Sequence, residues 1–152
     1  MSSRQAESIR VGSACTLVGF VGAGTVALIK PDPSVGGLLI AAVLSAFISA
    51  TAGWAFLVAP YPNASRRRVA LAMTGAAVLG HFLTWAIFTV AASPQLYLAN
   101  PSELLKLPIV ALLFGLGSLV VVGWLTTPLG IGIGLFFLKR RGTSSPIQAG
   151  PA

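Results

Sequence analysis

The chain has 152 residues, of which 55% are hydrophobic and only 9% are charged. Soluble globular domains carry about 25% charged residues, and disordered chains are poor in apolar residues, so this composition excludes both classes. It predicts a protein of the lipid bilayer with the size of one domain. The formal net charge of +7 therefore belongs to segments outside the bilayer, because charged side chains are costly inside it.

Four apolar blocks without Asp, Glu, Lys or Arg cover residues 11–29, 35–59, 69–92 and 107–138. Each is long enough for a helix that crosses the bilayer, which takes about 20 residues, and none alternates as barrel strands do. Helices satisfy their backbone hydrogen bonds within the segment. We therefore predict an all-α polytopic membrane protein, a bundle of four transmembrane helices over residues 11–138. Residues 1–10 form a cytoplasmic N-terminal segment in this interpretation, and residues 139–152 form a basic and then disordered cytoplasmic tail.

The distribution of Lys and Arg predicts the orientation. With four spans, the two termini and the connection between the second and third blocks share one side, which holds eight of the ten basic residues. The positive-inside rule places that side in the cytoplasm, and we expect a bacterial inner (plasma) membrane. Two alternatives are a fifth span, made by splitting the fourth block, and a first block that is a cleaved signal peptide. The two basic clusters are expected to set the topology and to attract anionic lipid head groups; they comprise Arg66, Arg67, Arg68, Lys139, Arg140 and Arg141.

The fourth block is longer than one span requires. At 1.5 Å per residue, about 32 residues would extend roughly 48 Å. Pro128 predicts a kink or hinge in this helix, since proline removes a backbone hydrogen bond. The hydroxyls of Thr126 and Thr127 can bond to carbonyls that the proline frees. One long kinked helix, and a span joined to an interfacial or re-entrant segment, are both compatible with the sequence.

Small residues predict where helices approach closely, because tight packing of small side chains drives helix association in lipid. In the second block they fall on one helical face, and in the third they recur at four-residue spacing. The residues expected to pack helices together are Ala42, Ala46, Ala50, Gly53, Ala72, Ala76 and Gly80.

His81 is the only histidine and lies near the middle of the third block. An ionisable residue within the membrane is by default a functional hypothesis. Thr74, His81 and Thr84 share one helical face, and Ser45, Ser49 and Ser118 lie at a similar depth in other blocks. In one interpretation a neutral His81 links helices by hydrogen bonds, with Ser45, Ser49 or a carbonyl as partner. In the other it contacts a substrate or relays protons.

The sequence contains no recognisable catalytic constellation. One His, one Cys and two Met cannot supply a usual zinc site, and Cys15 has no basic neighbour in the membrane to activate it. We expect no enzymatic activity, no cofactor and no metal. The expected function is that of an accessory or scaffold subunit or a homo-oligomer. Its expected partners are the lipid bilayer and a membrane protein or a second copy of the chain, with no nucleic acid. The alternative is a small transporter or channel, including a holin-like pore, that uses the stripe of Thr74, His81 and Thr84.

Overall fold

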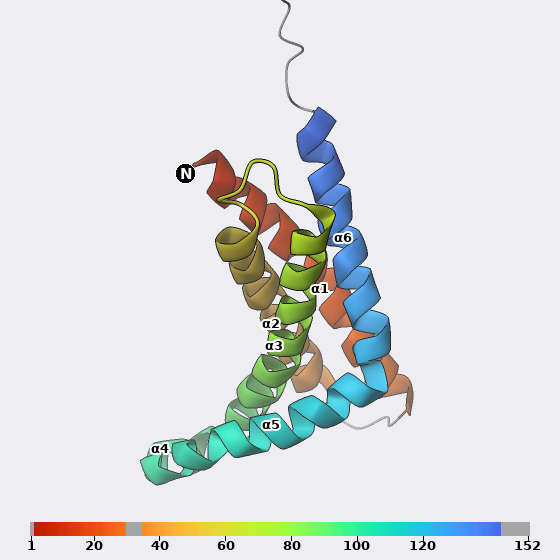
Figure 1. The fold of residues 1–152 in the computed structure, drawn as a ribbon. Coiled ribbons are helices and arrows are strands. Elements are labelled where there is room, and N and C mark those ends of the chain that lie inside the picture. Colours follow the sequence, from red (N-terminus) through yellow and green to blue (C-terminus); the bar gives the residue numbers. More distant parts are fainter. Residues whose placement is uncertain (1, 30–34, 144–152) are drawn as a thin grey trace, which may run out of the picture.

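The computed structural model describes residues 2–29 and 35–143, and every regular element there is a helix (Figure 1). Four stretches, Ser3–Ile29, Val35–Leu57, Arg66–Ala92 and Pro101–Arg141, are long and apolar enough to cross a membrane. The prediction of an all-α chain with four such helical stretches is confirmed. The predicted disordered tail lies, from residue 144 onward, outside the described residues. The elements in chain order are α1 (Ser3–Ile29), α2 (Val35–Leu57), α3 (Arg66–Ala92), α4 (Pro94–Ala99), η1 (Pro101–Lys106), α5 (Leu107–Ser118), η2 (Leu119–Gly123) and α6 (Trp124–Thr143).

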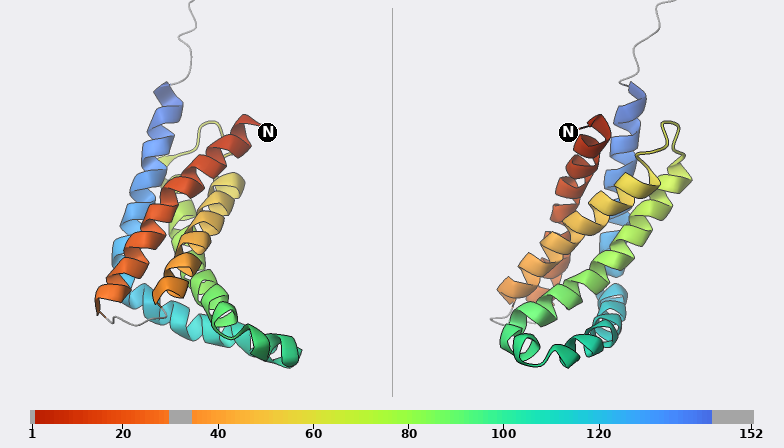
Figure 2. Two further views of the ribbon diagram at one scale, coloured as in Figure 1. Left: turned by 180° about the vertical axis from the view of Figure 1, so that it is seen from behind. Right: turned by 90° about the vertical axis from the view of Figure 1, so that its left-hand side faces the viewer.

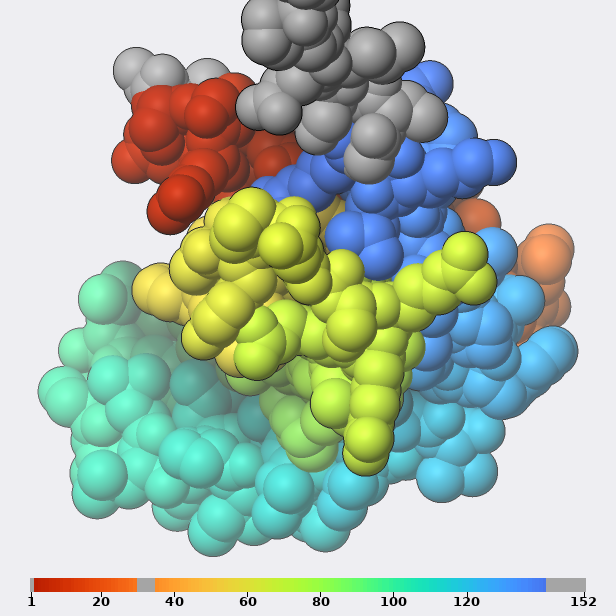
Figure 3. Space-filling model, turned by 45° about the horizontal axis from the view of Figure 1, so that its top comes forward, coloured from red at the N-terminus to blue at the C-terminus, as the bar shows by residue number. Residues whose placement is uncertain are grey.

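The long helices pack side by side around a common interior. α2 packs against α1 and α3, while α6 packs against α3 and α1 (Figure 2). The start of α1, the connection from α2 to α3 and the end of α6 lie together at one end of the molecule (Figure 3). Both basic clusters, residues 66–68 and 139–141, belong to this end, which we call the basic end. α4 and η1 lie at the opposite end.

Two helices begin before their apolar blocks because polar residues cap their N-termini. α1 begins at Ser3, where the Ser2 hydroxyl accepts a bond from the Gln5 N–H at 3.3 Å and Gln5 Oε1 accepts one from the Ser2 N–H at 2.9 Å. This reciprocal pair is a capping box. α3 begins at Arg66, since the Ser65 hydroxyl accepts a bond from the backbone N–H of Arg68 at 3.2 Å. The first residue of a helix is therefore set by its cap, whereas an apolar block marks only the part of the helix that is free of charged residues.

The fourth block changes direction at η2, a π-helical turn over Leu119–Gly123. α6 continues as an α-helix through Pro128, so the predicted kink at that proline is not confirmed. α5 runs beside the C-terminal part of α3, and the pair leans away from α1 and α2. Their contact is close, because a Cβ atom on Gly115 would lie 2.4 Å from the ring of Phe82.

Candidate functional site

The interior next to the basic end is filled by large side chains. Trp54, Val11 and Val58 are completely buried, and Met73 is 2% exposed. Phe137 of α6 packs edge-on against Trp54 with 6.5 Å between ring centroids. This cluster joins α1, α2, α3 and α6 and closes their shared interior towards the basic end.

An ion pair between the first and last helices covers this cluster. Arg141 donates two hydrogen bonds to the two carboxylate oxygens of Glu7, a bidentate arrangement. The Arg141 guanidinium also donates to the backbone oxygens of Val58 and Tyr61, at 3.5 and 3.4 Å. The two charged side chains are only 20% and 21% exposed. Arg141 was expected only to set topology and attract lipid, and the structure adds a role in holding α1, α6 and the α2–α3 connection together.

The other half of the interior contains a partly open cavity of about 100 Å³. Cys15, Ala50 and Met73 belong both to its lining and to the packed cluster, so they form the boundary between the two halves. An apolar cavity of about 150 Å³ in another protein binds benzene or xenon, which shows that a space of this order can hold a small molecule. Most of the lining is made of small residues, among them Gly19, Gly22, Ala23, Ala42, Ala46, Ala76, Ala77 and Gly80.

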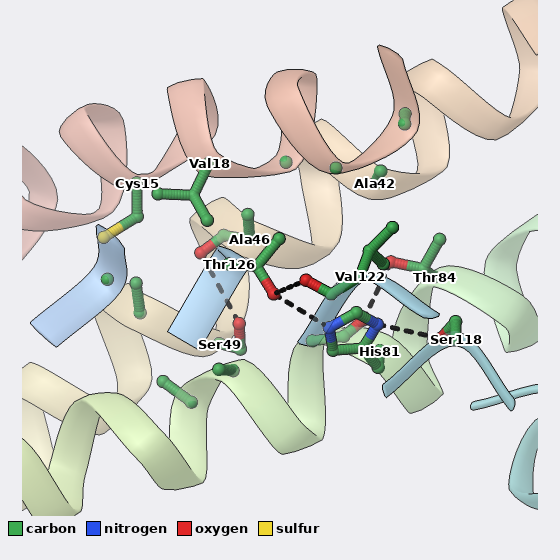
Figure 4. Close-up of a pocket in the computed structure, with 18 of the residues that line it drawn as sticks. Cys15, Val18, Ala42, Ala46, Ser49, His81, Thr84, Ser118, Val122 and Thr126 are labelled. Atoms are coloured by element: carbon green, nitrogen blue, oxygen red, sulfur yellow. Dashed lines mark hydrogen bonds between the residues drawn. The ribbon is translucent and has the colours of Figure 1, made fainter. Parts of the chain in front are cut away.

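His81 of α3 forms the main polar part of the cavity wall (Figure 4). Its Nδ1 lies 2.8 Å from the Ser118 hydroxyl of α5, and its Nε2 lies 3.1 Å from the Thr126 hydroxyl of α6. Residues 118 and 126 are eight positions apart and would be separated by about 12 Å along a straight helix. The change of direction at η2 brings both hydroxyls to one imidazole, so His81 connects α3 to both sides of the bend.

Each of these two hydroxyls also bonds to a carbonyl of its own chain segment. The Ser118 hydroxyl donates to the Gly115 carbonyl at 3.0 Å, and the Thr126 hydroxyl donates to the Val122 carbonyl at 3.2 Å. A hydroxyl has one proton, and a neutral imidazole has one N–H and one acceptor nitrogen. With a neutral ring, the hydroxyl that faces the acceptor nitrogen must therefore turn away from its carbonyl or leave that nitrogen without a donor.

The other predicted polar residues lie in different environments. Ser45 and Ser49 are buried, but they donate to carbonyls of their own helix at 2.6 and 2.7 Å. They are not the partners of His81, and the prediction of that pairing is wrong. Thr84 lines the cavity, as does Ser49, and bonds to the Gly80 carbonyl at 2.8 Å. Thr74, half-buried on the same helix, does not line it.

Thr126 is the site residue that sequence reasoning missed. It was considered only as a hydroxyl that could compensate for Pro128. The available signal was only a threonine in the same apolar block as Ser118. On a straight helix Ser118 and Thr126 would lie too far apart to share a partner, and the π turn between them brings them together.

The small residues of α2 lie where helices approach closely. A Cβ atom on Gly19 of α1 would lie 2.5 Å from the Ala42 carbonyl oxygen, and one on Gly53 would lie 3.2 Å from the Ala72 carbonyl oxygen. A Cβ on Gly80 would meet the Ser49 hydroxyl at 3.1 Å. Ala42, Ala46, Ala50, Ala76 and Gly80 also line the cavity. The same small side chains thus permit close helix contacts and leave the interior space.

The described part of the site has no charged wall and no ligand set for a metal. Within residues 2–29 and 35–143, no group of three or more His, Cys, Asp or Glu is placed to hold a metal ion. The described lining includes the hydroxyls of Ser49, Thr84, Ser118 and Thr126, the thiol of Cys15 and the imidazole of His81. This arrangement can bind an uncharged molecule through hydrogen bonds and apolar contacts. Comparison with protein-family models, with curated proteins and with solved structures finds no match to this chain.

Proposed function

We propose that this chain is a non-enzymatic integral membrane protein that holds a small uncharged molecule among its four spanning helices. The observation that carries the proposal is the cavity of about 100 Å³ that reaches His81. Among the described residues, its lining contains no Asp, Glu, Lys or Arg, and an unpaired charge in such surroundings would cost several kcal/mol. In this proposal both termini lie in the cytoplasm, because the basic clusters gather at one end of the molecule.

Binding is favoured over free passage because the basic end is closed. The packed cluster around Trp54 and the ion pair between Glu7 and Arg141 lie between the cavity and that end. A transporter would have to separate these contacts in each cycle. The alternative of a transporter therefore uses only Thr84 and His81 of the predicted stripe at the binding position, because Thr74 does not line the cavity.

A role as an accessory subunit or homo-oligomer is a second candidate, favoured by the outer surface of α5. Ile109 and Leu113 are 62% and 65% exposed, and the hairpin of α3 and α5 leans away from the other helices. In this proposal a second copy of the chain, or another membrane protein, packs against the hairpin. The two candidates are compatible, since the cavity faces inward and this surface faces outward.

The test is extraction of the protein in mild detergent, followed by mass spectrometry of the small molecules that copurify. Ala77 lines the cavity, whereas Ala91 is exposed on the same helix. We expect one molecule to copurify at near-stoichiometric amount with the wild type and with Ala91→Leu, and to be strongly depleted in Ala77→Leu. Equal amounts in all three proteins would identify bulk lipid and contradict the proposal.

A further inference from the structure

We propose that a groove at the basic end, between the start of α1 and the end of α2, binds an anionic phospholipid such as phosphatidylglycerol. This inference rests on the membrane location in the proposed function and not on the cavity, with which the groove shares no residue. The groove has a volume of about 600 Å³. Its lining includes Arg4, Gln5, Ser8 and Ile9 of α1, together with Thr51 and Ala55 of α2.

The groove crosses the boundary between the charged and the apolar parts of these helices. α1 and α2 run in opposite directions, so the start of α1 lies beside the end of α2. Arg4 precedes the first apolar block, whereas Ala55 belongs to the second. The groove is therefore polar in its outer part, at Arg4 and Gln5, and apolar further in, at Ala55 and the 40% exposed Ile9. A phospholipid at the edge of the bilayer has the same order, with its head group outside the hydrocarbon.

The outer part of the groove carries a positive charge that no described residue neutralises. Within residues 2–29 and 35–143, the exposed guanidinium of Arg4 makes no ion pair and no hydrogen bond. The structure describes two acidic residues, and both have other partners. Glu7 binds Arg141, and Glu103 binds Lys106 at the opposite end of the molecule. The charge of Arg4 is therefore available to an anionic ligand.

Gln5 adds uncharged donors to this charge. Its Oε1 accepts a hydrogen bond from the Ser2 N–H at 2.9 Å, while its amide nitrogen donates to none of the described residues. The Ser8 hydroxyl is already used, since it donates to the Arg4 carbonyl at 2.9 Å. Phosphate oxygens accept hydrogen bonds from guanidinium and amide N–H groups. A lipid with a net negative head group suits these donors, whereas the choline of a zwitterionic lipid brings a second positive charge close to Arg4.

The experiment is native mass spectrometry of the full chain in mild detergent, with phosphatidylglycerol or phosphatidylcholine of identical acyl chains added at increasing concentration. Arg4→Gln should weaken binding of the first phosphatidylglycerol about fivefold, the factor that one basic residue near an anionic lipid provides, and should leave binding of phosphatidylcholine unchanged. Arg10→Gln is the matched control, because Arg10 is also exposed on α1 but does not line the groove. We expect this control to bind both lipids as the wild type does.

Equal weakening by Arg4→Gln and Arg10→Gln would identify general attraction to the basic end and overturn the groove as a site, as would unchanged binding in Arg4→Gln. Release of phosphatidylglycerol by an equal concentration of inorganic phosphate would overturn the lipid as the ligand, because the apolar part of the groove would then contribute nothing. Ala55→Leu, which adds bulk to that part, should weaken phosphatidylglycerol binding, and its thermal unfolding is measured alongside. If that variant does not fold, the competition with phosphate decides. The cavity is tested separately by the molecule that copurifies, so either proposal can fail alone.

Discussion

Replacing His81 by leucine tests the connection between α3 and the bend at η2. The substitution removes two contacts, at 2.8 Å to the Ser118 hydroxyl and at 3.1 Å to the Thr126 hydroxyl, and keeps a side chain of similar bulk. Hydrogen bonds between helices in membrane proteins average about 0.6 kcal/mol and reach about 1.7 kcal/mol. We therefore expect His81→Leu to lower the free energy of unfolding by about 1–2 kcal/mol.

The assay is unfolding in mixed micelles of mild detergent and SDS, followed by circular dichroism. His81→Gln should lose about half as much free energy, since its amide offers one donor group and one acceptor. A double-mutant cycle that combines His81→Leu with Thr126→Val should give a coupling energy of about 0.5–1 kcal/mol. Thr74→Val on the same helix is the matched control and should change stability by less than about 0.5 kcal/mol. An unchanged stability of His81→Leu together with zero coupling would refute the bridge across η2.

Three further predictions concern packing, the ion pair and topology. Gly19→Ala should lower the free energy of unfolding by about 1–3 kcal/mol, because its Cβ would lie 2.5 Å from a backbone oxygen of α2; Gly24→Ala, with open space around it, should leave stability unchanged in the same assay. Glu7→Gln should cost about 1–3 kcal/mol, between the values for exposed and buried pairs, because Arg141 loses its carboxylate; the control Glu103→Gln, whose lysine partner is 68% exposed, should cost less than about 0.5 kcal/mol. Reporter fusions at residue 152 and in the α2–α3 connection should report cytoplasm and a fusion in α4 the opposite side, and an external signal at residue 152 would contradict the orientation.

The number of long apolar helices follows from the sequence because it depends on local composition. Charged residues are absent from each apolar block, and a helix of that length satisfies its own backbone hydrogen bonds wherever it lies. The uneven distribution of Lys and Arg is likewise visible without coordinates, and the structure places residues 66–68 and 139–141 at the same end. The small face of α2 was also visible, since helical periodicity places side chains on faces before any partner is known.

The tertiary structure decided the details that depend on how one helix meets another. The sequence pointed to His81 but not to Thr126, because residues 118 and 126 share one imidazole only after the π turn redirects the chain. Glu7 and Arg141 are 134 residues apart, and no local pattern links them. The cavity, too, arises only from tertiary packing. Large side chains fill the half of the interior near the basic end, and small side chains line the other half. Small side chains can close a gap or leave one, and the outcome depends on the distance between the helix axes. That distance is determined by the whole set of contacts between the helices.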